Sequence, residues 1–267
     1  MESDMISFNE IVYFDCETTG LPPKDAKWET DYEQFPRICQ LSWIYDGHEE
    51  NHIIRPDGWE IPQEATDVHG ITNEYAQEHG EPLDDVMGKF IADCHAAKLI
   101  CGHNVHFDVS TVKSELMRKA SYDQFADDAL YKGKRIDTMR PSMKFVDARF
   151  SNGRLKFPRL EELYAKCFPG ESFPAHDAIE DVRAVVRCLP VLVDKGIIEL
   201  IVKDYPVEQI KIEFPTNTVK PKTGGLTGLN EKMDKSPVSV VKATENENSP
   251  KITLNNRLAE MMADDNF

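Results

Sequence analysis

Residues 11–20, Ile-Val-Tyr-Phe-Asp-Cys-Glu-Thr-Thr-Gly, limit the possible folds more than any other part of the sequence. The first four are β-branched or aromatic, which is typical of a buried strand. Side chains alternate between the faces of a strand, so Asp15 and Glu17 share one face. Two neighbouring carboxylates at a buried strand end repel each other and lose hydration. A divalent cation with oxygen ligands would offset both effects. Two solvated acids at a strand end are the alternative, and this stretch alone leaves both interpretations open.

The first third of the chain predicts an antiparallel meander. Residues 37–45 and 50–55 have strand composition, and Asp46-Gly47 between them is a turn signal. Residues 21–36, bracketed by prolines and rich in charge, are predicted to form a loop. This loop leaves the acidic strand and would form one wall of a site.

Later segments alternate between helical and strand patterns. Helices are predicted over residues 62–69, 82–97, 104–120, 159–168 and from 175 onward, with short strands at 98–103 and 134–138. Gly70 and Thr72 have the residue types of a helix C-cap and N-cap. Residues 197–214 are predicted to be a last packed segment.

Further acids lie at two other element ends. Asp108 follows the strand at residues 98–103, at a strand-to-helix junction where α/β folds place their sites. An acid early in a helix also offsets the macrodipole without any function. His176 precedes Asp181 by five residues, so a loop histidine and a helical acid can face one pocket. Of the rival acids, Asp177 is interpreted as a cap or solvated acid and Glu180 as exposed.

The constellation of Asp15, Glu17, Asp108, Asp181 and His176 predicts phosphodiester chemistry. Four carboxylates at separate element ends suit two Mg²⁺ or Mn²⁺ ions about 4 Å apart. One ion would generate hydroxide from water and the other would stabilise the departing oxygen. A neutral histidine can take the proton from that water, because its ordinary pKa is close to neutrality.

Composition restricts the remaining possibilities. The net charge is −16, and residues 216–267 hold equal numbers of acidic and basic residues, so the excess lies in residues 1–215. If the protein acts on nucleic acid, it would bind it locally, with metal supplying much of the positive charge. Acidity that serves only solubility is the alternative. No apolar run is long enough for a membrane span, and no signal peptide is evident. The scattered cysteines, at positions 16, 39, 94, 101, 167 and 188, fit reduced thiols in a cytoplasmic protein.

Three motifs, at residues 15–20, 102–108 and 176–181, resemble in order the exonuclease motifs of the DEDDh (DnaQ-like) family. That family includes the proofreading epsilon subunit of bacterial DNA polymerase III, and residues 68–72 resemble a segment common near that subunit. The resemblance implies an α/β, RNase H-like fold with a mixed five-stranded sheet flanked by helices. We expect this exonuclease domain to span residues 1–215. Residues 216–267 are expected to form a disordered tail that could carry a partner-binding peptide.

The resemblance also implies stepwise 3′→5′ hydrolysis that releases nucleoside 5′-monophosphates. Asp15, Glu17, Asp108 and Asp181 would hold the metals, with His176 as general base. The substrate-side residues would be Thr18, Thr19, Gly20, Leu21, His69 and Asn104. The expected substrate is the 3′ end of single-stranded DNA, in proofreading or repair, with a DNA polymerase or another protein as partner. An RNA-trimming enzyme and a catalytically idle docking module are the alternatives.

Overall fold

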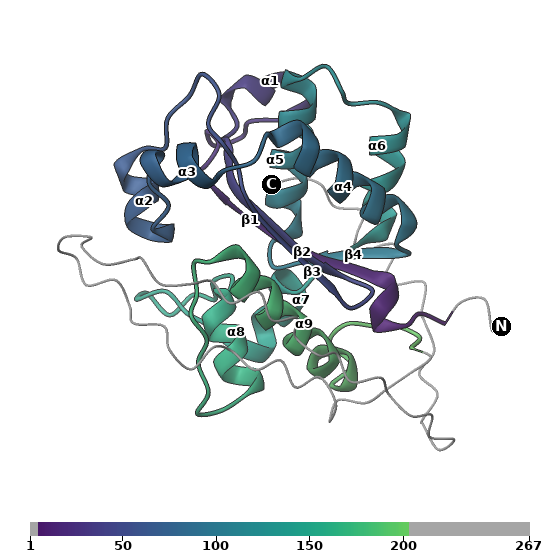
Figure 1. The fold of residues 1–267 in the computed structure, drawn as a ribbon. Helices are drawn as coiled ribbons and strands as arrows, with labels where there is room; N and C mark the ends of the chain where they lie inside the picture. The colour runs from purple at the N-terminus through teal and green to yellow at the C-terminus, as the bar shows by residue number, and fades with distance from the viewer. Residues whose placement is uncertain (1–4, 203–267) are drawn as a thin grey trace, which may run out of the picture.

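The computed structural model describes residues 5–202, whose centre is a five-stranded sheet in the order β3-β2-β1-β4-β5 (Figure 1). The strands are β1 (Ile11–Thr18), β2 (Ile38–Tyr45), β3 (His48–Ile53), β4 (Leu99–Gly102) and β5 (Arg135–Asp137). β1 pairs antiparallel with β2 and parallel with β4, so the sheet is mixed. The predicted RNase H-like arrangement of a mixed five-stranded sheet is confirmed.

The β2–β3 hairpin confirms the predicted meander. Its two turn residues, Asp46 and Gly47, have φ values of 46° and 78°. Positive φ at both positions defines the tight turn whose twist matches that of the flanking strands. The acidic strand β1 therefore lies in the middle of the sheet, with β2 on one side and β4 on the other.

The helices cover both faces of the sheet (Figure 1). Their bounds are α1 (Trp28–Asp31), α2 (Gln63–His69), α3 (Asn73–His79), α4 (Leu83–Ala96), α5 (Val105–Arg118), α6 (Gln124–Ala129), α7 (Met139–Val146), α8 (Leu160–Cys167) and α9 (Ala178–Asp194). Short 3₁₀ helices occur at Phe8–Glu10, Tyr32–Gln34 and Lys132–Lys134. Both caps predicted for the second and third helices are present, with Gly70 at φ 78° and the Thr72 hydroxyl accepting from the Tyr75 N–H.

Two hydrophobic cores lie on opposite faces of the sheet. Val12 and Phe14 point to the face covered by α4, α5 and α6. Ile11 and Tyr13 point to the other face, where α8 and α9 pack. A strand covered on both faces must be apolar at successive positions, which explains why the residues before Asp15 are all apolar. None of the helices in the described part of the chain is long and apolar enough to cross a membrane.

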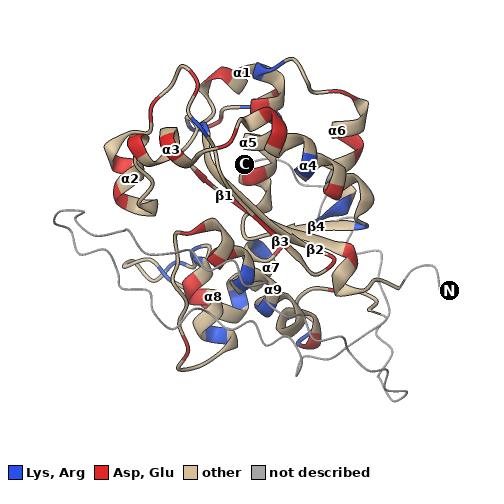
Figure 2. Ribbon diagram, in the orientation of Figure 1, with Lys and Arg blue, Asp and Glu red and all other residues tan. Residues whose placement is uncertain are grey.

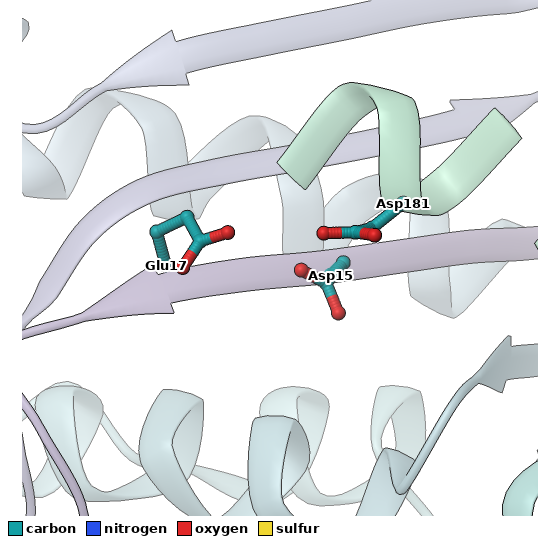
Figure 3. Close-up of side chains that lie close together, drawn as sticks. All are labelled: Asp15, Glu17 and Asp181. Carbon is teal, nitrogen blue, oxygen red and sulfur yellow. The ribbon is translucent and has the colours of Figure 1, made fainter. Parts of the chain in front are cut away.

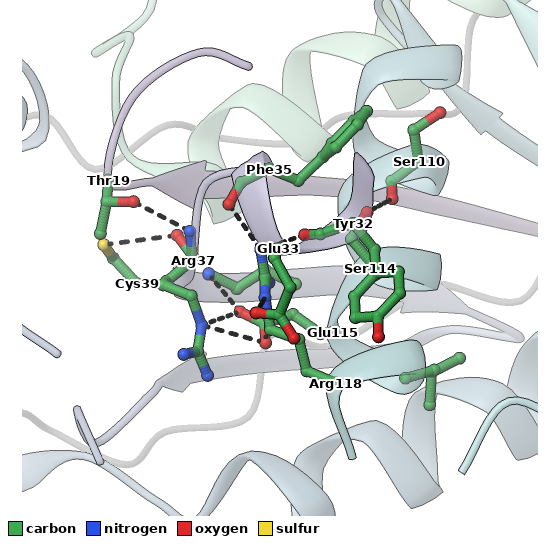
Figure 4. Close-up of polar contacts among 12 residues, drawn as sticks. Thr19, Tyr32, Glu33, Phe35, Arg37, Cys39, Ser110, Ser114, Glu115 and Arg118 are labelled. Carbon is green, nitrogen blue, oxygen red and sulfur yellow. Dashed lines mark hydrogen bonds and ion pairs between the residues drawn. The ribbon is translucent and has the colours of Figure 1, made fainter. Parts of the chain in front are cut away.

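The segment from 21 to 36 differs from the predicted loop, because it contains α1 and the 3₁₀ helix Tyr32–Gln34. These turns form because the segment packs on α5 (Figure 4). The Arg118 guanidinium donates to the carbonyls of Tyr32 and Phe35. Glu115, 1 % exposed, accepts from Arg37 Nε at 2.9 Å and lies 3.2 Å from Arg118 Nη1. The segment is thus fixed beside the end of β1.

Two predictions reach beyond the described residues. Ile198 and Leu200 are buried, as expected for the start of the last packed segment, but residues 203–214 lie outside the description. The proposed tail at residues 216–267 also lies outside it. The domain boundary at residue 215 therefore stays a prediction.

Candidate active site

The acids from the first and third motifs meet at the carboxyl end of β1. Asp15 and Glu17 project from β1, and Asp181 reaches them from α9 (Figure 3). One carboxylate oxygen from each residue lies within 4.8 Å of the other two. The strand alternation predicted for Asp15 and Glu17 thus places them side by side, and the first turn of α9 supplies the third carboxylate.

The pKa values of these three carboxylates are raised above their ordinary range. Burial, followed by the charge of Asp177, raises the pKa of Asp15 to about 7. Burial and the neighbouring charges of Asp15 and Asp177 raise the pKa of Glu17 to about 8. Burial, followed by Asp15 and Glu17, also raises the pKa of Asp181. Buried acids that repel one another are stabilised in the charged state only by added positive charge.

Asp108, predicted to be the fourth ligand, lies next to this triad but outside it. It is 3 % exposed and accepts a hydrogen bond from the Cys16 thiol, with Sγ and Oδ1 3.1 Å apart. Cys16 and Asp15 project from opposite faces of β1. The hydrogen bond from the Cys16 thiol directs the Asp108 carboxylate toward Cys16. Burial and then the charge of Asp15 raise the pKa of Asp108, so the two acids are close enough to interact.

His176 lies in the turn that begins α9. Its φ of 69° is in the left-handed region, an uncommon conformation for a residue other than glycine that is found at functional sites. The turn is fixed by its own backbone N–H, which donates to Asp181 Oδ2 at 3.1 Å. The His176 ring is 54 % exposed, and its Nε2 lies 3.9 Å from Glu161 Oε1 on α8. His176 is therefore beside the triad and open to solvent, as a group that accepts a proton from water requires.

Of the two rival acids near Asp181, Glu180 differs from the sequence interpretation and Asp177 agrees with it. Glu180, expected to be exposed, is 5 % exposed because it forms an ion pair with Arg183 at 2.7 Å. Asp177 caps α9 without a side-chain cap bond, and its charge acts on Asp15 and Glu17. Asp177 is thus an exposed cap residue, as predicted, whose charge also reaches the triad.

Sequence reasoning missed Gln40, which joins β2 to the start of α9. Gln40 is opposite Glu17 in the β1–β2 register and is 4 % exposed. Its Nε2 donates to Asp177 Oδ1 at 2.8 Å, and its Oε1 accepts from the Ala178 N–H at 3.3 Å. The available signal was a pair of polar residues, Gln40 and Ser42, on the same face of an otherwise apolar strand.

The predicted substrate-side residues surround the end of β1. Thr18 Oγ1 donates to the carbonyl of Gly20, and the Arg37 N–H donates to Thr19 Oγ1, each at 2.8 Å. Leu21 is 83 % exposed. An apolar side chain presented to solvent beside the triad is suited to contact a base or sugar.

His69 and Asn104 come from other elements. Burial lowers the pKa of His69, and the backbone of Thr18 and the ring of His176 are close enough to act on it. Asn104 begins α5 at φ 68°, and its N–H donates to Asp137 Oδ1 at 2.9 Å. His69 therefore lies near the end of β1 and His176, whereas Asn104 lies at the start of α5 beside Asp137.

The donor set fits a hard divalent cation. All three triad members offer carboxylate oxygens, which Mg²⁺ and Mn²⁺ prefer. Their raised pKa values show that the site lacks positive charge of its own. Asp15, Glu17 and Asp181 would hold such an ion.

Comparisons with known proteins agree with this geometry. Exonuclease I of Methylocaldum szegediense superposes with a TM-score of 0.53 at 22% identity, covering 69% of this chain and 40% of that one. E. coli exonuclease I in complex with a dT13 oligonucleotide gives 0.54 at 23% identity, with the same two coverages. These likenesses confirm the fold.

A curated mouse protein, the interferon-stimulated gene 20 kDa protein, is 26% identical over 130 residues, which is 48% of this chain and 39% of the relative. The chain therefore spans about two fifths of each of these relatives. The family model described as RNase_T exonuclease matches residues 12–189, which include all three motifs and most of the described fold. The chain belongs to this exonuclease family, of the DEDDh (DnaQ-like) type that its motifs resemble.

Proposed function

We propose that this protein is a metal-dependent 3′→5′ exonuclease that removes nucleoside 5′-monophosphates from single-stranded nucleic acid, with DNA as the favoured substrate. The observation that carries the proposal is the carboxylate triad of Asp15, Glu17 and Asp181 beside an exposed His176. The family membership supports exonuclease chemistry. The E. coli relative bound to a dT13 oligonucleotide supports single-stranded DNA as the substrate class.

In this proposal each residue has a defined role. Two Mg²⁺ or Mn²⁺ ions, when bound, would supply the positive charge that favours hydroxide and stabilises the departing oxygen. Asp15, Glu17, Asp181 and Asp108 hold them. His176 accepts one proton of the attacking water, and the water oxygen bonds to phosphorus as the P–O3′ bond breaks. The released 3′-oxygen takes up a proton from solvent and becomes the 3′-hydroxyl of the shortened strand.

On the substrate side, Thr18, Thr19, Gly20 and Leu21 line the terminal nucleotide in this proposal. His69 and Asn104 contact the same nucleotide from the other side of the site. We further propose a role in proofreading or repair in the cytoplasm, with a polymerase or another partner bound through residues 216–267.

The test is a gel assay with matched 5′-labelled DNA and RNA oligonucleotides, with Mg²⁺, with Mn²⁺ and with EDTA. We expect a metal-dependent ladder that shortens from the 3′ end, fastest on DNA, and no ladder from Asp15→Ala. A ladder mainly on RNA would make the protein an RNA-trimming exonuclease with the same site. If neither strand is shortened even in Mn²⁺, the domain acts as a docking module instead.

A further inference from the structure

One segment of this acidic chain is locally basic. Between positions 138 and 159 there are six Lys or Arg residues and a single acid, Asp147, whereas the whole chain has a net charge of −16. Figure 2 shows these cations around α7 and the loop that leads to α8, while acidic residues predominate over α2 to α6. Within the described residues, this segment therefore forms a surface that attracts phosphate.

Part of this segment is an ordered hairpin, defined here as the basic hairpin (residues 147–157). Arg149 and Leu155 form an antiparallel bridge. The Phe150 N–H donates to the Arg154 carbonyl and the Lys156 N–H to the Ala148 carbonyl, each at 2.9 Å. The Arg149 guanidinium also donates to the Gly153 carbonyl at 2.8 Å, and Asn152 Oδ1 accepts from the Arg154 N–H at 3.0 Å. Backbone and side-chain bonds together therefore define the shape of the hairpin.

The basic hairpin carries exposed aromatic rings among its cations. Phe150 is 56 % and Phe157 44 % exposed. The Arg140 guanidinium lies 5.8 Å from the centre of the Phe157 ring. Proteins that bind single strands combine cations for the backbone with aromatic rings on which unpaired bases stack. In a duplex the bases are already stacked on one another, so these rings favour a single strand.

The hairpin leads directly to the candidate active site. The Pro158 carbonyl that follows it hydrogen-bonds His103 Nε2 at 2.9 Å, at the end of β4. Two residues after Arg159, Glu161 on α8 lies 3.9 Å from His176 Nε2. A strand whose 3′ end is at the triad would therefore have a basic and aromatic surface beside it.

We infer that the basic hairpin, with Lys144 of α7, binds the single-stranded nucleic acid upstream of the 3′ end that is being hydrolysed. The inference rests on the proposed exonuclease function, whose triad fixes where the strand ends. It assigns sequence-independent affinity to this surface: Lys144 and Arg154 contact phosphates, and Phe150 stacks on a base.

The charge test measures binding of a fluorescent 20-nucleotide oligo-dT by anisotropy, with the full chain in EDTA and at several salt concentrations. The test variant is the double charge reversal Lys144→Glu/Arg154→Glu. The control variant is Lys89→Glu/Lys119→Glu, which changes the net charge equally at exposed positions on α4 and just after α5. We expect the Lys144/Arg154 pair to weaken binding about tenfold or more. The slope of log binding constant against log salt concentration should fall in magnitude by about 1.4, or about 0.7 per phosphate contact. The control pair should stay within about twofold of the parent protein.

The stacking test uses Phe150→Ala on single-stranded and duplex DNA of the same length. We expect single-strand binding to weaken between about 5-fold and 150-fold with an unchanged salt slope, since the contact is uncharged. Duplex binding should not change. Circular dichroism of each variant verifies that the fold is intact.

The outcomes separate this inference from the proposed function. Equal losses in the two charge-reversal pairs, unchanged single-strand binding by Phe150→Ala, or no binding by the parent protein would each overturn the inference. If a metal-dependent ladder accompanies any of these results, the exonuclease proposal still stands. Binding that depends on the hairpin, in a protein that releases no nucleotide with Mg²⁺ or Mn²⁺, would support the inference and refute the exonuclease.

Discussion

At the scale of single residues, the burial of Asp15 beside Glu17 links the stability of the fold to pH. Their pKa values, raised to about 7 and about 8, mean that the folded protein holds protons more tightly than the unfolded chain. Their contribution to stability is complete below the unfolded pKa of about 4 and is lost as the pH rises through 7 and 8. Without metal, the protein should therefore be less stable in mild alkali than near neutrality.

We predict that the melting temperature in EDTA falls by about 3–10 °C between pH 6.5 and pH 8.5. A retained shift of one to two pKa units corresponds to about 1.4–2.7 kcal/mol, and each kcal/mol moves the melting temperature of a domain this size by about 2–4 °C. Calorimetry should show a smaller change of melting temperature with pH for the double variant Asp15→Asn/Glu17→Gln. Mn²⁺ should restore stability mainly at pH 8.5. A melting temperature in EDTA that is constant or rises with pH would contradict the pKa shifts.

His176 is expected to act on the rate and not on metal binding. Its ring extends into solvent, whereas only its backbone N–H contacts Asp181. We predict that His176→Ala lowers kcat by about 10²–10⁴, the usual size of a general-base contribution. The Mn²⁺ concentration for half-maximal activity should not change. His79→Ala, at an exposed position, is the matched control. If His176→Ala lost as much metal affinity as Asp15→Ala, the His176 ring would be a metal ligand.

At the scale of elements, the position of α9 relative to β1 depends on Gln40. We predict that Gln40→Ala lowers kcat about tenfold and raises the Mn²⁺ concentration for half-maximal activity, because the first turn of α9 carries Asp181. The side chain is buried and makes two bonds to that turn, so its loss leaves polar groups unpaired. Gln63→Ala, exposed on α2, is the control. Reduced thermal stability without any change in metal dependence would limit Gln40 to a structural role.

The segment after β1 depends in a similar way on Glu115 of α5. This buried carboxylate faces two guanidinium groups, and removing one partner of a buried ion pair costs about 3–5 kcal/mol. We predict that Glu115→Ala lowers the melting temperature by about 10 °C, measured by circular dichroism. Glu60→Ala, at an exposed position, should have no effect. An unchanged melting temperature in Glu115→Ala would show that water replaces the carboxylate at no cost.

The elements that sequence reasoning predicted are those with local signals. β1 has an apolar run that ends in paired acids, the hairpin turn has Asp46-Gly47, and α2 ends at Gly70. Contacts between distant segments leave no such signal. The bond from Cys16 to Asp108, the bond from Gln40 to Asp177, and the packing of α1 on α5 are all defined only by the folded chain.

At the scale of the whole molecule, the described fold contains both hydrophobic cores and every residue of the proposed site. The match to the exonuclease family ends at residue 189, within α9. Catalysis and folding should therefore depend on residues 1–215. Residues 216–267 are proposed only to bind a partner. They hold equal numbers of acids and bases, so the net charge of the whole chain is that of residues 1–215.

We predict that a chain ending after residue 215 keeps the melting temperature and the metal-dependent ladder of the full chain, because both cores remain complete. Calorimetry and the gel assay measure the two properties separately. The same truncation should abolish capture of any partner that the full chain binds, with Asp15→Ala in the full chain as a control that retains capture. If the truncated chain unfolds or melts far below the full chain, residues after 215 pack on the domain, and the predicted boundary is wrong.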